Sequence, residues 1–360
     1  MPQKAEPLTL TKVTKFGRSF VKYGSITLVV LTLIPATLSI LTALARMINP
    51  PPPPAPTVGF GLLPALAFPS QSVTDKPKSY ELETPTGTLP EFGDRAFVYL
   101  EMKNTANLLD NENAKAIAAR YSFTSEPEQL NGLTYRWTKL QPLRTTFDLD
   151  IIDHNFTYET DYLAHPELIL QSNLPSDFDA VQQVKTFLRN GGLLPDDLAS
   201  SSATINYLKA IGGTLKPAVS VSDADFVSVS LNRYPINNTY EFYTPDGITG
   251  TVQALLTGGK SNDSLVSIRR KYFPADYDQE ETYPIRTTAQ AWSTLQAGEG
   301  YVAQKGTQEK AVIRSVELGY YDSFEFQNYL QPIYVFKGDG GFIGYVPAVS
   351  SNYLSQTVNP

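Results

Sequence analysis

Acidic side chains gather in two short stretches whose spacing suits a cation site or an acid–base pair. In FDLDIIDHN, Asp148 and Asp150 alternate with apolar residues, which places both carboxylates on one face of a strand. In PADYDQEE, the calcium candidates Asp276, Asp278 and Glu280 stand at alternate positions. This stretch lacks the glycine at position six and the glutamate at position twelve of an EF-hand loop. We therefore expect a solvated strand face, a polar connector, and no bound metal.

The residues that most hydrolases use as nucleophiles are absent or lack their usual neighbours. The chain has no cysteine and only His154 and His165 as histidines, which excludes disulfides, thiolate nucleophiles, Cys-ligated zinc and a His-rich metal site. It contains no G-x-S-x-G or H-E-x-x-H motif, and no cofactor is expected. A carboxylate pair has no fixed spacing, so an envelope hydrolase that uses one stays an open alternative.

Residues 254–261, ALLTGGKS, match a relaxed phosphate-binding loop in which alanine replaces the first glycine. Such a loop works only when a helix follows it and offers backbone N–H groups to phosphate. Because residues 264–273 have the pattern of a strand, we expect a hairpin loop here and no nucleotide partner.

Two groups of apolar and aromatic residues are candidate binding surfaces. The first is an apolar strap, residues 58–69 (VGFGLLPALAFP), which glycine and proline interrupt too often for a membrane span. It is expected to lie on the folded body, on the membrane surface or on a partner, and the sequence does not decide which. The second is a group of C-terminal tyrosines, for which packing in a β-rich core is the alternative. The candidate residues are Phe60, Leu62, Leu63, Leu66, Phe68, Tyr320 and Tyr321.

One segment near the N-terminus has the length and composition of a membrane span. Residues 23–45 carry no charge, and at about 1.5 Å per residue they form roughly 34 Å of helix. Basic residues precede the segment and only Arg46 follows it closely, which places the N-terminus in the cytoplasm and the rest of the chain outside it. Ala43-Leu44-Ala45 has the form of a signal-peptidase site, so a signal peptide cleaved after Ala45 is the alternative to an anchor.

A proline run, 50–54, and Pro56 follow this segment and separate it from a folded body. The run predicts a polyproline II arm of roughly 20 Å, which acts as a spacer. The chain has 42% hydrophobic residues, enough for a sizeable core, and a net charge of -7. Since phosphate contacts need clustered basic residues, no nucleic-acid partner is expected.

Beyond residue 79 the pattern predicts short helices and antiparallel strands. Four helices are expected, at 110–120, at 177–190 after a Ser176 cap, at 203–211 before Gly212-Gly213, and at 287–298. A strand meander is expected over 133–139, 143–152 and 155–161, with further strands at 226–231, 264–273, 311–321, 330–338 and 341–349. Residues 244–247, TPDG, predict the turn of a hairpin that joins 239–243 to 248–256.

The C-terminal stretch from about 283 to 349 contains AWSTLQAGEGYV, VELGYY, LQPIYVF and YVPAV. In this stretch a helix that ends in glycine precedes a strand meander, on a chain with one N-terminal transmembrane helix. It resembles the bacterial PepSY-like and YycI/YycH-like extracytoplasmic regulatory proteins. The resemblance implies a non-catalytic regulator that lies outside the membrane and contacts a signalling partner, and it carries over no catalytic residue.

Together these features predict an α+β fold of repeated helix-plus-antiparallel-meander units on a single N-terminal transmembrane helix. The expected segments are a cytoplasmic tail (1–22), the transmembrane helix (23–46), the stalk and strap (47–78), a first α+β unit (79–175) and a second α+β region (176–360). We expect a membrane-anchored binding or regulatory module without catalytic activity, which contacts envelope or signalling proteins. The alternatives are the envelope hydrolase and a structural component of an envelope assembly.

Overall fold

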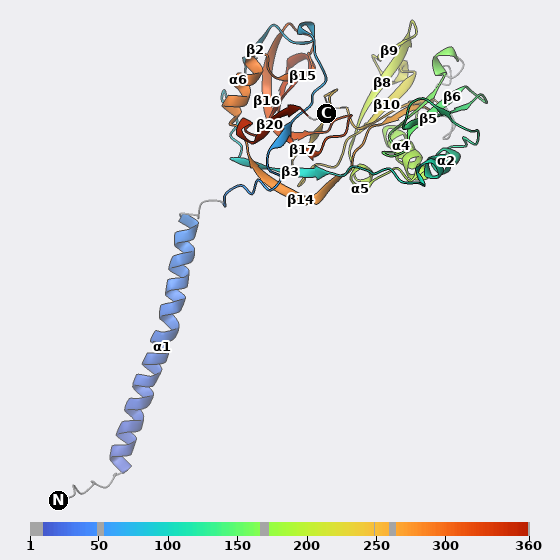
Figure 1. Ribbon diagram of the computed structural model, residues 1–360. Coiled ribbons are helices and arrows are strands. Elements are labelled where there is room, and N and C mark those ends of the chain that lie inside the picture. Colours follow the sequence, from blue (N-terminus) through green and yellow to red (C-terminus); the bar gives the residue numbers. More distant parts are fainter. Residues whose placement is uncertain (1–9, 49–53, 166–172, 248, 259–263, 359–360) are drawn as a thin grey trace, which may run out of the picture. The chain divides into compact units, whose positions relative to one another are not determined.

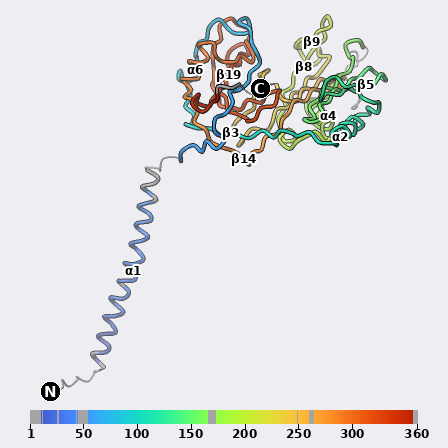
Figure 2. The backbone as a smooth tube through the Cα atoms, viewed as in Figure 1, coloured from blue at the N-terminus to red at the C-terminus, as the bar shows by residue number. Residues whose placement is uncertain are grey.

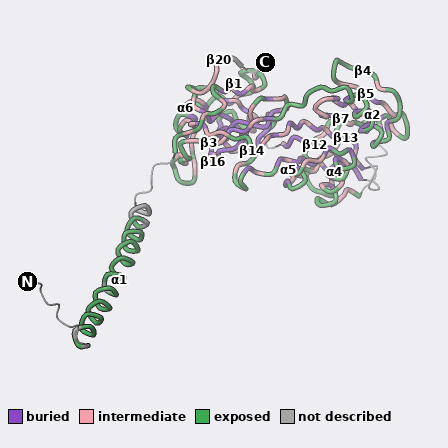
Figure 3. The backbone as a smooth tube through the Cα atoms, turned by 60° about the horizontal axis from the view of Figure 1, so that its bottom comes forward, coloured by how far each residue is buried: buried purple, intermediate pink, exposed green. Residues whose placement is uncertain are grey.

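The computed structural model describes residues 10–48, 54–165, 173–247, 249–258 and 264–358, and it divides into two compact units. The first, Met1–Ala55, contains the long helix α1 (Leu10–Ile48). Within α1, Val13–Thr42 is long and apolar enough to cross a membrane, and none of it is buried (Figure 3). This helix is therefore compatible with a membrane anchor or a signal sequence. The second unit, Pro56–Pro360, is the folded body.

The body is a mixed α+β fold that is mostly sheet. Within the described residues its largest sheet is antiparallel throughout and has the strand order β4-β5-β6-β7-β13-β12-β10-β8-β9. The expected meander and the strands at 226–231 and 264–273 are confirmed in it. The strands are β4 (Glu128–Gln129), β5 (Thr134–Lys139), β6 (Thr145–Asp150), β7 (Phe156–Thr160), β8 (Ala203–Ile211), β9 (Thr214–Pro217), β10 (Phe226–Leu231), β12 (Val252–Thr257) and β13 (Leu265–Arg270).

In the described part of the chain, three helices accompany this sheet: α2 (Asp110–Arg120), α4 (Asp177–Gly191) and the short α5 (Asp196–Ala199). The Ser176 side chain caps α4 by accepting from the backbone N–H of Asp179, as the sequence predicts, and Gly192 ends the helix in the left-handed conformation. The apolar side of α4 packs on the sheet and closes the larger core. The helices expected at 110–120 and near 177–190 are thus confirmed.

The helix expected at 203–211 is wrong, because this segment is strand β8. Ile205 packs into the core under α4, whereas Leu208 packs into a separate cluster, as the two-residue period of a strand requires. Gly212 and Gly213 have φ of 60° and 78° and form the two-residue turn into β9. The paired glycines therefore mark a hairpin, although they also fit the end of a helix.

A second, six-stranded sheet has the order β11-β16-β18-β19-β15. Its sixth strand, β2, pairs in parallel with β16. Helix α6 (Thr288–Gln296) covers it, capped by Thr287 as expected, and buries Ala291 and Leu295 against the sheet. The expected strands at 311–321, 330–338 and 341–349 are confirmed here. The strands are β2 (Ser79–Leu82), β11 (Phe242–Tyr243), β15 (Tyr301–Gln304), β16 (Lys310–Tyr321), β18 (Pro332–Gly338) and β19 (Phe342–Pro347).

The described residues form two further, smaller sheets. One is antiparallel, in the order β14-β3-β17, and the other pairs β1 with β20 in parallel. The strands are β1 (Leu63–Ala65), β3 (Arg95–Glu101), β14 (Ala275–Pro284), β17 (Tyr329–Leu330) and β20 (Leu354–Val358). Figures 1 and 2 show the early and late parts of the body chain together at one end, around the six-stranded sheet, and its middle part at the other.

The hairpin expected across residues 239–256 is also wrong. The turn itself is present, because Gly247 N–H donates to the Thr244 carbonyl at 3.0 Å. The strands on either side of it belong to different sheets, since β11 pairs with β16 whereas β12 pairs with β10 and β13. The turn therefore carries the chain from one sheet to the other.

Repeated helix-plus-meander units are not shown by the structure. The first meander runs through neighbouring strands in chain order, β4-β5-β6-β7. After α6, by contrast, β15 pairs with β19, which lies at the far end of that stretch of sequence. The two segments share an order of elements but not a topology.

The apolar strap, residues 58–69, is part of the body. Val58 N–H donates to the Thr282 carbonyl, Gln331 Nε2 donates to the Pro64 carbonyl, and β1 of the strap pairs with β20. Leu63 is fully buried, whereas its neighbour Leu62 is 61% exposed. The sequence left three locations for the strap: the folded body, the membrane surface or a partner. In the structure the strap lies on the folded body.

Replacing Leu63 by alanine should destabilise the body by about 2–5 kcal/mol, because it leaves a cavity in a closed apolar cluster. Leu62→Ala is the matched control and should change stability by less than about 0.5 kcal/mol. Urea unfolding of the detergent-solubilised chain, followed by tryptophan fluorescence, measures both. Equal, small effects of the two changes would mean that the strap does not pack on the body.

Candidate functional site

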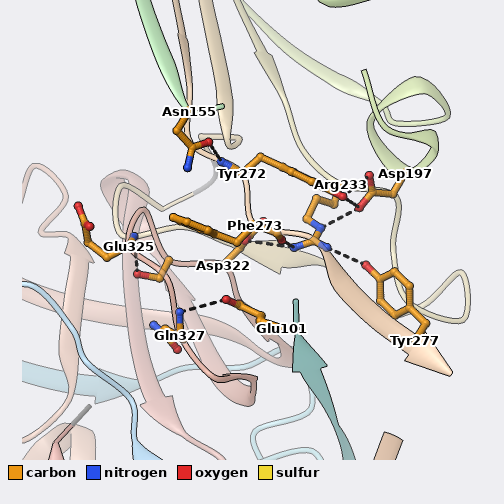
Figure 4. A network of polar contacts seen from close by, with 11 residues as sticks. Glu101, Asn155, Asp197, Arg233, Tyr272, Phe273, Tyr277, Asp322, Glu325 and Gln327 are labelled. Atoms are coloured by element: carbon orange, nitrogen blue, oxygen red, sulfur yellow. Dashed lines mark hydrogen bonds and ion pairs between the residues drawn. The ribbon is translucent and has the colours of Figure 1, made fainter. Parts of the chain in front are cut away.

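A fully buried arginine follows β10 and binds partners from three other parts of the body (Figure 4). This residue is Arg233. Its Nε donates to Asp197 Oδ2 at 2.9 Å, and its Nη2 donates to Tyr277 Oη at 3.1 Å. Nη1 donates to the Phe273 carbonyl at 3.1 Å and contacts Asp322 Oδ1 at 3.4 Å. Several strong acceptors thus surround one guanidinium, as burial of a charge requires.

Aromatic rings cover the guanidinium on its faces. The Cζ atom of Arg233 lies 4.9 Å from the ring centre of Phe242 and 4.8 Å from that of Tyr272. The Tyr272 hydroxyl also donates to Asp197 Oδ1 at 3.0 Å, so both oxygens of that carboxylate accept a hydrogen bond. The cation is therefore stabilised by charge, by hydrogen bonds and by ring faces at once.

The partners of Arg233 join the sheets of the body. Asp197 lies on α5, Tyr277 lies on β14 of the three-stranded sheet, and Asp322 follows β16 of the six-stranded sheet. Arg233 itself leaves the nine-stranded sheet at the end of β10. The network is thus the junction of three sheets.

Two carboxyl groups near the arginine have raised pKa values. Burial raises the pKa of Asp322 to about 6, although the Arg233 charge opposes this. Burial, and next the Asp322 charge, raise the pKa of Glu101 on β3 to about 8, so Glu101 is mostly protonated at neutral pH. Glu101 Oε2 accepts from the Gln327 backbone N–H at 3.0 Å. Burial lowers the pKa of Arg233, but the charges of Asp322 and the other acidic neighbours raise it by more. The pKa of Arg233 is therefore above its ordinary value.

A pocket of about 560 Å³, the junction pocket, opens beside this network and shares Asp197 and Tyr277 with it. Aromatic rings form part of its wall, with Tyr99 and Tyr277 edge to face at a centroid distance of 5.5 Å. Burial, and next the charge of Glu280, raise the pKa of Tyr99 to about 12. The wall consists of Tyr99, Asp196, Asp197, Ser200, Tyr234, Pro235, Ile236, Asn237, Asn238, Tyr277 and Glu280.

The wall of the junction pocket is acidic. Among its described residues are three carboxylates, Asp196, Asp197 and Glu280, and no lysine, arginine or histidine. Of these, Asp197 is neutralised by Arg233, whereas no ion pair is described for Asp196 or Glu280. Negative charge beside tyrosine faces is the environment that attracts organic cations.

The binding-surface candidates from the sequence mostly lie in the interior. Leu63, Leu66, Tyr320 and Tyr321 are buried, and Phe60 and Phe68 are half-buried, so as a surface this prediction is wrong. The strap and the C-terminal tyrosines pack against each other, because the rings of Phe68 and Tyr321 meet edge to face with their centroids 4.6 Å apart. Leu62 is the exposed member of the set.

The acidic clusters have structural roles. Asp148 accepts two hydrogen bonds of 2.6 Å from Arg136 on the neighbouring strand, and Asp150 Oδ1 accepts from two backbone N–H groups of the next turn. The expected connector at 276–281 is instead part of strand β14, where Asp276 accepts from the Asp278 backbone N–H. Across the described part of the chain, no three His, Asp or Glu side chains come together as a metal site requires. Glu280 alone lines the junction pocket.

The phosphate-loop candidate connects two paired strands. Residues 259–263 lie outside the described residues, but β12 precedes them and β13, antiparallel to it, follows. The prediction of a strand after the loop is confirmed.

Arg233 and, apart from Glu280, the wall of the junction pocket were not singled out by the sequence. The residues that meet there are separated along the chain by 36 positions for Arg233 and Asp197 and by 89 for Arg233 and Asp322. One local signal was available, namely an arginine two residues after Leu231, the last residue of the strand FVSVSL, whose other apolar residues include Val227 and Val229. Such a position favours burial, and burial of an arginine requires carboxylate partners.

No family model and no curated protein matches the chain. Among solved structures it is similar to an uncharacterized protein from Eubacterium rectale, with 10% sequence identity, a TM-score of 0.40, and coverage of 74% of this chain and 80% of that one.

The raised pKa of Glu101 predicts a stability that depends on pH. A buried carboxyl whose pKa is about 8, against an ordinary 4.5, contributes stability that is full below about pH 4.5 and is lost as pH rises through 8. The free energy of unfolding should therefore fall by up to about 1.4 kcal/mol per pH unit within this window. Glu101→Gln keeps the acceptor for the Gln327 N–H and should flatten the decline, making the variant the more stable protein at pH 8.

Urea unfolding at pH 5, 6, 7 and 8 measures this dependence. Exposed Glu128 is the control, and Glu128→Gln should leave the slope unchanged. A slope that Glu101→Gln does not reduce would mean that Glu101 is ionised in the folded body.

Proposed function

We propose that this chain is a membrane-anchored binding module of the extracytoplasmic side of a bacterial envelope, and that its junction pocket receives a cationic group of the partner. The observation that carries the proposal is a tyrosine-lined pocket whose described wall has carboxylates and no basic side chain, on a body that follows an apolar helix. In this proposal the module binds and regulates and does not catalyse.

The proposed orientation of the chain in the membrane rests on the charges around α1. Basic residues lie before the apolar stretch and Arg46 alone closely follows it, which favours an anchor with its N-terminus in the cytoplasm and the body outside. An exposed apolar surface along α1 fits lipid contact. The absence of cysteine is compatible with an oxidising exterior.

The chemistry of the pocket favours an amine or a quaternary ammonium group. Asp196 and Glu280 supply negative charge at the pocket wall, and Tyr234 and Tyr277 are 45% and 39% exposed there. A cation over a tyrosine face gains about 0.5–2 kcal/mol, and a carboxylate adds charge attraction. A lysine side chain of an envelope or signalling protein has this chemistry. The resemblance of residues 283–349 to PepSY-like and YycI/YycH-like regulators supports a protein partner.

An envelope hydrolase with a carboxylate pair is the second candidate. It is favoured by the presence of Asp196 and Glu280 on one pocket wall. The pair Glu101 and Asp322 is a weaker choice, since both side chains are almost fully buried and Asp322 contacts Arg233.

The test compares two ligands that differ in one amine. Acetyl-lysine amide with a free ε-ammonium should bind the detergent-solubilised chain, and acetyl-norleucine amide, which has the same chain length without the charge, should not. Asp196→Asn combined with Glu280→Gln should abolish the difference, and Tyr234→Leu should weaken binding roughly 2- to 30-fold. Isothermal titration calorimetry measures these affinities.

Glu281→Gln is the matched control, because Glu281 neighbours Glu280 on β14 and is not part of the pocket wall. Equal binding of both ligands, or of neither, would contradict the proposal. Release of soluble fragments from envelope glycans, lost in the Asp196 and Glu280 double variant, would favour the hydrolase instead.

A further inference from the structure

A second pocket, the α6 pocket, lies between helix α6 and the turn that follows β19. Its volume is about 580 Å³, and it shares no wall residue with the junction pocket. Arg286 precedes the α6 cap and is the one charged residue among the described residues of the wall. The wall consists of Arg286, Ala289, Gln290, Ser293, Thr294, Ser350, Ser351 and Asn352.

The backbone of Arg286 is held firmly on both sides. Its N–H donates to the Ala348 carbonyl at 2.8 Å, and its carbonyl accepts from Tyr334 Oη at 2.6 Å. Arg286 therefore occupies a fixed place at the junction of β14 and α6, independently of what its side chain binds.

The guanidinium of Arg286 has little to bind within the protein. Nη1 lies 3.5 Å from Thr294 Oγ1 and Nη2 lies 3.4 Å from the Val349 carbonyl, both long for hydrogen bonds. Nε is buried and has no partner within the described part of the chain. Burial lowers its pKa, opposed by the nearby Tyr334 and Glu299, yet no ion pair joins it to a described carboxylate. Arg233, by contrast, has strong acceptors on every side.

A guanidinium carries five N–H donors in a planar fork that matches a carboxylate. A guanidinium held by two long hydrogen bonds and by no described carboxylate, in a pocket whose described wall has no acidic residue, is an arrangement that a bound anion completes. The rest of the wall offers hydroxyl and amide groups, which complement the hydroxyls of a polar ligand. The Ser293 and Thr294 hydroxyls each donate to a backbone carbonyl of α6, so their oxygens can still accept from a hydroxylated ligand, which an apolar acid would not use.

We propose that the α6 pocket is a binding site for a carboxylate-bearing, polyhydroxylated molecule of sugar-acid chemistry, with Arg286 on the carboxylate and the hydroxyl and amide side chains on the ring. A volume of about 580 Å³ accommodates a molecule of this size. The site is independent of the junction pocket and of the function proposed for it.

Titration of the detergent-solubilised chain with sodium glucuronate tests the proposal. Glucuronate should bind more tightly than glucose, which lacks the carboxylate, and than acetate, which lacks the hydroxyls. Arg286→Lys keeps the charge and loses the fork, and should weaken glucuronate binding about tenfold. Arg286→Gln should abolish it.

Two further variants separate binding from folding. Ser293→Leu fills the pocket from the exposed face of α6 and should abolish binding while the thermal unfolding temperature stays within a few degrees of the parent. Arg314→Gln removes an exposed arginine that pairs with Asp339 and Glu83, and should leave glucuronate binding unchanged.

Tighter binding of inorganic phosphate than of glucuronate would overturn the sugar-acid assignment, and so would equal binding of acetate and glucuronate. Lack of glucuronate binding by the folded parent chain, or binding that Ser293→Leu leaves intact, would overturn the site.

Discussion

The body depends on the neutralisation of one buried charge. Arg233 has no exposed side-chain surface, and an uncompensated guanidinium in such a place costs several kcal/mol or more. Its acceptors are fixed to α5, to β14 and to the end of β16. The sheets that carry these elements can separate only by exposing the cation or leaving its carboxylates unpaired. The junction is thereby specified by charge in addition to apolar packing.

This same network determines the electrostatics of the junction pocket. Asp197 and Tyr277 each turn one polar group toward Arg233 while forming part of the pocket wall. Because the positive charge is taken up by Asp197 and Asp322, it does not offset Asp196 and Glu280 at the wall. The ion pairs of Arg233 thus leave the junction pocket with a net negative charge. The proposed preference for a cationic group follows from how the interior is neutralised.

The accuracy of the sequence predictions follows the range of the interactions involved. The helix after Ser176 was predictable because cap, period and glycine stop all lie within one segment. The segment 203–211 was mispredicted because paired glycines end both helices and hairpins, and only the partner strands β9 and β10 decide between them. The strap was recognised as apolar, but its place required β20, almost 300 residues away. Arg233 and the pocket wall depend wholly on such distant contacts.

The strap and the junction pocket are connected through a single strand. Val58 and Thr57 hydrogen-bond to Thr282 near the end of β14, and the same strand carries Tyr277 and Glu280 on the pocket wall. A register shift between Asp276 and Glu280 interrupts its pairing with β3 at the pocket, so the strand is regular where the strap binds and irregular where the wall forms. Displacement of the strap would therefore act on β14, and β14 leads directly to the pocket. In an anchored module, this arrangement joins the strap, which follows the proline run in the sequence, to the proposed binding site without an intervening loop.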